Sequence, residues 1–156
     1  MLSAQPRKWY SWDFTLNDAE GRHVGDVDLS SWRERGKLVL DGIEYRVRPE
    51  GLCGPFALED GVSVLARARR TSLLRCEFEI EFEGDHYTLK KASLWSPTIV
   101  LRQGAEELGT IRHAAWYKRG ARVELAERLS PVLQAFALWL ALLLWKRDAG
   151  AAAAGA

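Results

Sequence analysis

The sequence predicts a mainly β protein: a closed antiparallel barrel of about 12 strands that encloses a hydrophobic C-terminal helix at about residues 131–147. Three observations lead to this expectation. Several segments alternate between apolar and polar residues, turn-forming glycines recur about every 20 residues, and one apolar segment near the C-terminus has a helical composition.

The strands are predicted from their period of two. The clearest is RCEFEIEF at residues 75–82, where the even-numbered residues are apolar and the odd-numbered residues are charged. A half-buried antiparallel strand has this pattern. WYSWDFTL at residues 9–16 also alternates, with Tyr10 and Trp12 at the start of its apolar face. VSVLARAR at residues 62–69 alternates more weakly, because its alanines add little apolar area.

Glycines predict the turns between these strands. An acidic or polar residue precedes glycine at positions 21, 42, 61, 84 and 104, and Arg119-Gly120 is a weaker sixth candidate. Glycine supplies the positive φ that tight hairpins require. One hairpin for about every 20 residues gives two short strands per unit, and six units give about 12 strands. A twisted antiparallel sandwich remains the alternative.

The segment from Val132 to Trp145 predicts the helix. Ser130 is a favourable N-cap, and Pro131 suits the first helical position. Gln134 is the single polar residue of the segment. As a helix, the segment would be about 21 Å long, which is too short to cross a hydrocarbon layer of about 30 Å. Because it is apolar on every side, other parts of the protein or a lipid layer must surround it. We therefore expect the barrel to enclose it; a C-terminal membrane anchor is the alternative.

The predicted organisation is one domain at residues 1–148, followed by an alanine- and glycine-rich tail at 149–156 that we expect to be disordered. Cys53 and Cys76 are too few for a disulfide framework, and the N-terminal residues contain no apolar signal-peptide core. The expected location is the cytoplasm, including a peripheral position at the inner membrane surface. No transmembrane span is expected.

The composition argues against several function classes. The formal net charge of +1 gives no global basic field for nucleic-acid binding. His23, His86 and His113 are too far apart for a metal motif, so no metal site is expected. The sequence contains no nucleophile elbow, phosphate-binding loop or dinucleotide fingerprint. We therefore expect a protein that is not an enzyme and that requires no cofactor.

The order of hairpins and the C-terminal segment resemble the tubby C-terminal-like superfamily, which includes phospholipid scramblases and LURP-one-related proteins. The resemblance covers about residues 8–148. It rests on the segments DAEGRHVGDVDL, LVLDGIEYRV, FEGDHYTL, LRQGAEELGTIRH and ARVELAERLSPVLQAFALWLALLLWKRD.

The resemblance implies a twelve-stranded barrel around a hydrophobic C-terminal helix. Tubby domains bind phosphoinositides through basic residues, and scramblases associate with membranes and calcium. Neither ligand set can be assigned to residues of this chain. Glu124 and Glu127 alone are too few for a calcium site, which takes about 6–8 oxygen ligands. Scramblase activity is therefore not expected.

A cluster of arginines is the predicted ligand-binding site, in the segment RARRTSLLR. Forked guanidinium donors fit a phosphate group or an anionic lipid headgroup. An ordinary charged outer face, balanced by the glutamates of residues 77–81, is the alternative. Lys90 with Lys91, or Lys118 with Arg119, would serve equally well. The cluster consists of Arg67, Arg69, Arg70 and Arg75.

These observations lead to one expected function and two alternatives. The expected function is non-enzymatic binding of an anionic phospholipid headgroup, or of another phosphate-bearing ligand, at the membrane surface. The first alternative is a protein-interaction scaffold that binds a protein partner and no small ligand. The second is a tail-anchored membrane protein.

Overall fold

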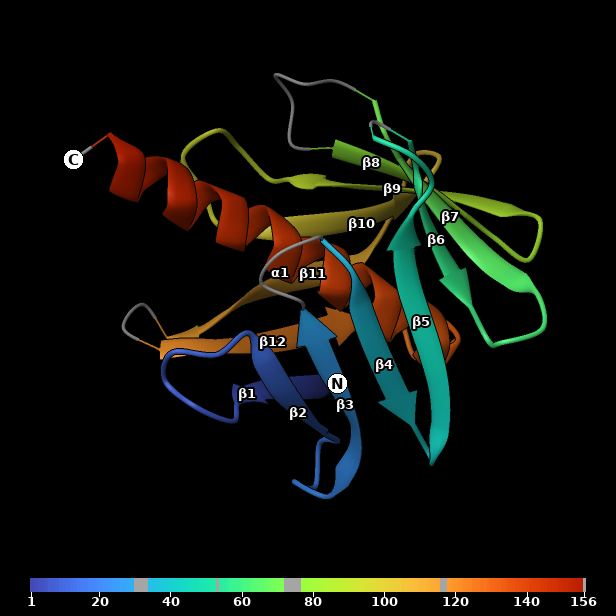
Figure 1. The fold of residues 1–156 in the computed structure, drawn as a ribbon, viewed down its shortest axis with the longest axis horizontal. Helices are drawn as coiled ribbons and strands as arrows, with labels where there is room; N and C mark the ends of the chain where they lie inside the picture. Colours follow the sequence, from blue (N-terminus) through green and yellow to red (C-terminus); the bar gives the residue numbers. More distant parts are fainter. Residues whose placement is uncertain (30–33, 53, 72–76, 116–117, 156) are drawn as a thin grey trace.

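The computed structural model describes residues 1–29, 34–52, 54–71, 77–115 and 118–155. These residues form a closed antiparallel barrel of 12 strands with one C-terminal helix (Figure 1). The predicted fold class is therefore confirmed, and the sandwich is excluded because the first strand pairs with the last.

The strands are short and follow one another along the chain. They are β1 (Leu2–Pro6), β2 (Asp13–Asn17), β3 (His23–Leu29), β4 (Gly36–Leu40), β5 (Ile43–Pro49), β6 (Phe56–Glu59), β7 (Val64–Arg70), β8 (Glu77–Phe82), β9 (Asp85–Lys91), β10 (Ile99–Gln103), β11 (Glu106–Ala115) and β12 (Lys118–Leu125).

Each strand pairs with its neighbours in sequence, and β1 closes the ring against β12. An antiparallel ring of consecutive strands places its connections alternately at two ends. The connections that follow even-numbered strands form the hairpin end. The connections that follow odd-numbered strands, such as residues 7–12 and 92–98, form the loop end.

Glycine conformation explains the tight turns of the hairpin end. The five glycines expected to form turns, at positions 21, 42, 61, 84 and 104, all have positive φ. In two turns the preceding residue, Asp41 or Glu83, also has positive φ, as a two-residue turn that follows the strand twist requires. These five predicted hairpins are confirmed.

The sixth predicted hairpin forms between β11 and β12, but the predicted position of its turn is wrong. Arg119 and Gly120 lie inside β12, and the β11–β12 connection falls at residues 116–117, outside the described residues. Gly120 lies in a closely packed part of the strand: a Cβ atom there would lie 3.1 Å from the carbonyl oxygen of Ala4 and 3.3 Å from the Cβ of Ala114.

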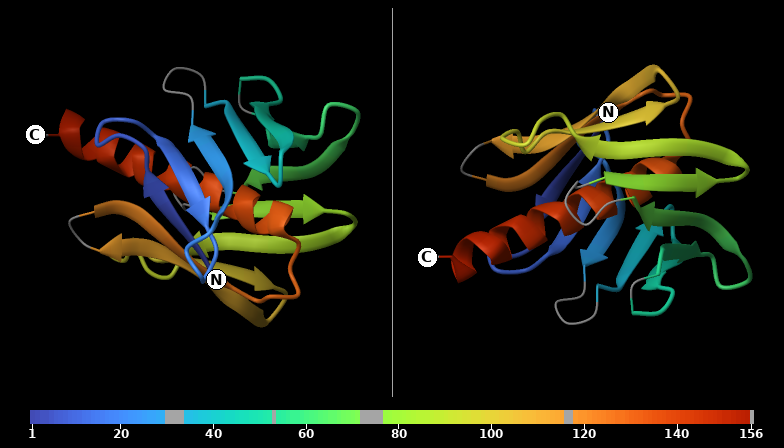
Figure 2. Two further views of the ribbon diagram at one scale, coloured as in Figure 1. Left: turned by 90° about the horizontal axis from the view of Figure 1, so that it is seen from below. Right: turned by 90° about the horizontal axis from the view of Figure 1, so that it is seen from above.

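The helix α1 (Pro131–Ala154) begins at the hairpin end and leaves the barrel at the loop end (Figure 2). The Ser130 hydroxyl caps it by accepting a hydrogen bond from the backbone N–H of Val132 at 3.3 Å. All residues of 133–145 are buried, as expected for a helix enclosed by the barrel. It continues past the expected end at 147, through most of the alanine- and glycine-rich segment expected to be disordered.

The core forms between this helix and the inward side chains of the strands. Phe14, Phe78 and Trp139 are among its largest fully buried side chains. The Trp139 indole contacts the Phe56 ring and donates its N–H to the backbone carbonyl of Asp28 at 3.2 Å. The apolar residues of α1 therefore pack against strands. The described part of the chain contains no helix with the length and hydropathy to cross a membrane.

Candidate functional site

The predicted arginine cluster lies on and beside β7, and two of its members face solvent. Arg67 and Arg69 are exposed on the outer face, where their strand positions pair with Glu81 and Glu79 of β8. The Arg67 Nε donates to a carboxylate oxygen of Glu50 at 2.9 Å, and a terminal nitrogen of Arg69 donates to Glu79 at 2.9 Å. Both cations therefore already have carboxylate partners.

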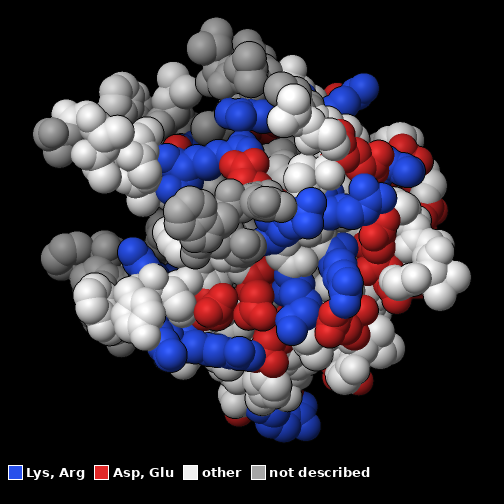
Figure 3. Space-filling model, viewed as in Figure 1, with Lys and Arg blue, Asp and Glu red and all other residues white. Residues whose placement is uncertain are grey.

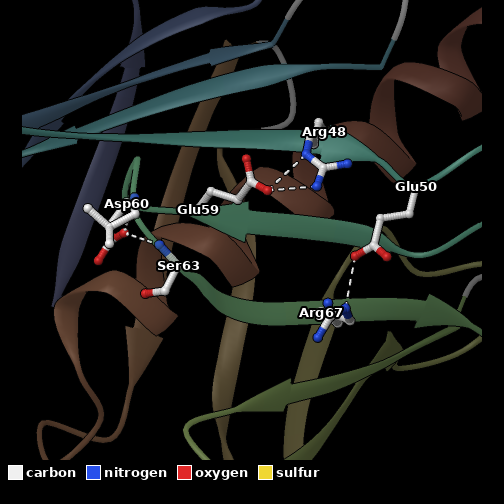
Figure 4. A network of polar contacts seen from close by, with 7 residues as sticks. Arg48, Glu50, Glu59, Asp60, Ser63 and Arg67 are labelled. Atoms are coloured by element: carbon white, nitrogen blue, oxygen red, sulfur yellow. Dashed lines mark hydrogen bonds and ion pairs between the residues drawn. The ribbon is translucent and has the colours of Figure 1, made fainter.

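The same pairing extends to the neighbouring strands. Two guanidinium nitrogens of Arg48 lie 2.9 and 2.7 Å from one carboxylate oxygen of Glu59, beside the Glu50–Arg67 pair (Figure 4). On the face drawn in Figure 3, basic and acidic side chains alternate over the strands without separating into fields of one sign. The outer wall thus matches the balanced charged face that was the alternative to a ligand site.

The other two predicted arginines do not complete a patch there. Arg70 follows Ala66 and Ala68 in strand alternation, on the face opposite Arg67 and Arg69. Arg75 lies outside the described residues. The structure therefore brings together two of the four predicted site residues.

A different surface, at the loop end, exposes several large apolar side chains to solvent. Trp9 and Tyr10 in the β1–β2 loop and Leu94 and Trp95 in the β9–β10 loop are 84%, 60%, 83% and 94% exposed. Both loops project from the side where α1 emerges, in all the ribbon views (Figures 1 and 2). We call these four residues the apolar rim. Tyr10 was expected on the inward face of a strand, but β2 begins only at Asp13.

Hydrogen bonds donated by backbone N–H groups define the two loops of the apolar rim. In the β9–β10 loop the backbone N–H of Ala92 donates to the Thr98 carbonyl at 2.9 Å, and the Ser96 N–H donates to the Ser93 hydroxyl at 3.2 Å. In the β1–β2 loop the Arg7 N–H donates to the Asp13 carbonyl at 2.8 Å. These bonds close each loop and leave its large side chains at the tip.

Cations accompany the apolar rim. The Lys8 ammonium lies 5.8 Å from the Tyr10 ring centroid. The Arg119 guanidinium lies 5.1 Å from the Trp12 ring centroid and donates to the Trp9 backbone carbonyl at 3.0 Å. Neither cation forms an ion pair with a described carboxylate, in contrast to the arginines of the outer wall. Cations above aromatic rings are stabilised by the ring quadrupole.

The emerging end of α1 is tied to the loop end. The Trp145 indole N–H donates to the Pro97 carbonyl at 2.7 Å, and Arg147 forms a two-point ion pair with Glu34 at 2.8 and 2.6 Å. Lys91 also pairs with Asp148. On the left of Figure 3 two largely white lobes protrude, where Figure 1 places the end of α1 and the β1–β2 loop. The surface around the apolar rim is therefore uneven, and two acidic side chains at this end, Glu34 and Asp148, are each paired with a basic residue.

Burial shifts the pKa of three titratable groups near this end, lowering that of Lys146 as well as changing those of His113 and Asp28. Desolvation lowers the pKa of His113, whose ring stacks on Trp145. Burial, followed by repulsion from Asp13, raises the pKa of Asp28 on β3. Among the described residues no group of three or more histidine, cysteine or acidic side chains is placed to hold a metal ion.

The apolar rim was missed by sequence analysis, although the β9–β10 loop carries a signal. Leu94 and Trp95 stand between serine and proline residues that are typical of turns. Large apolar residues in such a loop indicate exposure.

Comparisons of the chain with protein families, with curated proteins and with solved structures returned no match.

Proposed function

We propose that this chain is a non-enzymatic module that binds the surface of anionic phospholipid membranes, and that the apolar rim is the surface that touches the lipid. The observation that carries the proposal is the exposure of Trp9, Tyr10, Leu94 and Trp95 on one side of the barrel. The closed barrel around a central C-terminal helix also supports membership of the tubby C-terminal-like superfamily.

The residue types of the apolar rim fit the membrane interface. Tryptophan and tyrosine have amphipathic rings that are enriched at the depth of the lipid headgroups. Trp9 and Trp95 come from two loops on the side of the barrel from which α1 emerges, so the proposed bilayer contact involves both loops and the projecting end of α1. Their large exposed area is otherwise unfavourable in water.

The charges next to the apolar rim favour anionic lipid. Lys8 and Arg119 lack described carboxylate partners, and Lys90 is exposed one residue before the end of β9. A basic residue close to an anionic leaflet contributes about 1 kcal/mol to binding. The outer-wall arginines contribute less, because Arg67 and Arg69 are held by glutamates.

Vesicle co-sedimentation tests the proposal. We expect the protein to sediment with vesicles of phosphatidylglycerol and phosphatidylcholine but only weakly with pure phosphatidylcholine. The double variant Trp9→Ser/Trp95→Ser should lose at least tenfold in affinity for anionic vesicles. Loss of interfacial tryptophan burial is the reason.

A matched control removes apolar area from the opposite end of the barrel. Ile43, the first residue of β5, and Val62, in the β6–β7 turn, are 54% and 95% exposed at the hairpin end. Ile43→Ser/Val62→Ser should leave vesicle binding unchanged, as should Arg67→Gln/Arg69→Gln on the outer wall. Equal loss in all three double variants, or no binding by the wild-type protein, would contradict the proposal.

A further inference from the structure

A cleft opens where the first and last strands of the barrel separate. The β1–β12 ladder runs from Leu2 opposite Val123 to Ala4 opposite Ala121. Beyond Ala4, β1 continues along β2 as far as Pro6, while the start of β12 continues along β11. The separation leaves a cleft of about 740 Å³, which we call the seam cleft.

Small residues hollow out the seam cleft. Ala114, Ala115 and Gly120 line it from β11 and β12, and Gln5 and Pro6 line it from β1. Gly120 leaves this space open, and a Cβ atom there would make tight contacts with Ala4 and Ala114. The hollow therefore arises because the residues that β11 and β12 contribute at this point are small.

Arg119 and Trp9 complete the lining. The bond from Arg119 to the Trp9 carbonyl uses one terminal nitrogen, and the guanidinium group is oriented over the Trp12 ring. A guanidinium group that is already oriented loses less entropy when it binds an oxyanion. The Trp9 side chain adds an exposed apolar surface beside this cation.

The charge of the lining distinguishes the seam cleft from the two described hollows on the outer wall. Those hollows of about 250 and 210 Å³ contain Arg67, but glutamates, including Glu81 in both, also line them. The described lining of the seam cleft has one cation and no acidic residue. An anionic ligand would therefore meet attraction in the seam cleft and opposed charges on the outer wall.

We propose that the seam cleft binds one phosphate ester, with its phosphate on Arg119 and its apolar body along Trp9, Pro6 and Ala115. The volume lies in the range of small-ligand sites, about 300–1,000 Å³, and holds a phosphoglycerol group with the first carbons of its chains. A membrane phospholipid is one source of this chemistry and a soluble phosphate ester is the other. The lipid source rests on the proposed function; phosphate binding itself does not.

Calorimetric titration with water-soluble probes tests the seam cleft without a membrane. The probes are dihexanoylphosphatidic acid at monomeric concentrations, glycerol phosphate, and dihexanoylglycerol as the analogue without phosphate. We expect saturable binding of dihexanoylphosphatidic acid and none of dihexanoylglycerol. Affinity at least tenfold weaker for glycerol phosphate would assign the cleft to lipids, and equal affinity would assign it to soluble phosphate esters.

Two variants locate the bound probe. Arg119→Gln should weaken dihexanoylphosphatidic acid binding at least tenfold, and Arg119→Lys should weaken it less. Because Arg119 also holds the Trp9 carbonyl, Ala114→Trp provides an independent test: Ala114 is exposed, so tryptophan there should fill the cleft and block binding without changing the thermal midpoint.

A third variant separates this proposal from membrane binding. Trp95→Ser changes the apolar rim away from the cleft and should weaken vesicle binding while leaving dihexanoylphosphatidic acid binding unchanged. Absence of saturable binding of either phosphate ester, or unchanged affinity in both Arg119→Gln and Ala114→Trp, would overturn the seam-cleft proposal and would leave the test of the apolar rim unaffected.

Discussion

The imidazole ring of His113 stacks on the indole ring of Trp145, with centroids 3.9 Å apart and planes inclined by 24°. His113 belongs to β11 and Trp145 to the end of the buried part of α1. The contact joins the helix to the barrel wall at the loop end. Desolvation there disfavours the imidazolium form and lowers the pKa of His113.

This shift predicts a pH dependence of stability. The unfolded chain binds the His113 proton more readily than the folded chain, so the free energy of unfolding is highest above the unfolded pKa of about 6.5 and falls as the pH drops towards the folded pKa. Urea unfolding at pH 7.5 and 5.5 measures this difference. His113→Phe should make it smaller; an equal or larger difference in that variant would contradict the assignment.

Asp28 should have the opposite effect: its contribution to the free energy of unfolding falls as the pH rises. Its Oδ1 atom is buried without a hydrogen-bond partner in the described structure, and its pKa is raised. An ionised Asp28 therefore destabilises the fold as the pH rises above the unfolded pKa of about 3.9. Asp28→Asn should raise the free energy of unfolding at pH 7 and lose this advantage near pH 3.

The urea midpoint of Asp28→Asn at the two pH values measures this effect. Asp13→Asn is the informative control, because Asp13 repels the Asp28 charge. It should stabilise the protein at pH 7 by a smaller amount. Destabilisation by Asp28→Asn at pH 7 would show that the carboxylate is held by favourable interactions.

The enclosed helix makes a charge at its centre intolerable. Leu140 is fully buried, and a buried, unpaired guanidinium costs several kcal/mol against a total stability of about 5–15 kcal/mol. Leu140→Arg should abolish soluble folding, as measured by soluble yield and by circular dichroism. Ala151→Arg, in the exposed end of the same helix, should fold normally. A soluble, folded Leu140→Arg protein would contradict enclosure of the helix.

One substitution at two glycines should have opposite effects. A Cβ atom on Gly36 would lie 1.9 Å from the Trp139 Nε1 atom, whereas one on Gly150 meets no atom within 4 Å. Gly36→Ala should lower the free energy of unfolding by at least about 2 kcal/mol. Gly150→Ala should raise it by about 0.5 kcal/mol through helix propensity. Chemical denaturation of both variants measures the pair.

The fold was largely predictable because its turns and its core have local signatures. Gly42 and Gly84 sit in turns that need positive φ, and the all-round apolar segment of α1 needs a surrounding wall. Gly120 misled the placement of the sixth turn, because the sequence does not distinguish a glycine in a closely packed strand from a glycine in a turn. The interval of about 20 residues cannot separate these two causes.

The candidate site was less predictable because it depends on partners far apart in sequence. The clustering of Arg67 and Arg69 was visible in the sequence, but the neutralising contact from Glu50 depends on a loop that packs beside β7. Likewise, Arg119 meets the Trp9 carbonyl only because β12 closes the barrel near β1. Strand periodicity predicts which face of the sheet a residue occupies, but it does not predict which residues distant in sequence will contact it.

Quenching of tryptophan fluorescence by brominated lipid acyl chains tests the central claim, contact between the apolar rim and the bilayer, most directly. The parent protein for this experiment carries Trp12→Phe, Trp32→Phe and Trp116→Phe; Trp139 and Trp145 are enclosed, so Trp9 and Trp95 should account for most of its quenching. In Trp9→Phe/Trp95→Phe the phenylalanines retain vesicle binding, and the quenching should fall by more than half. Equal quenching in the parent protein and in the variant, at equal vesicle binding, would place the lipid contact elsewhere and contradict the proposal.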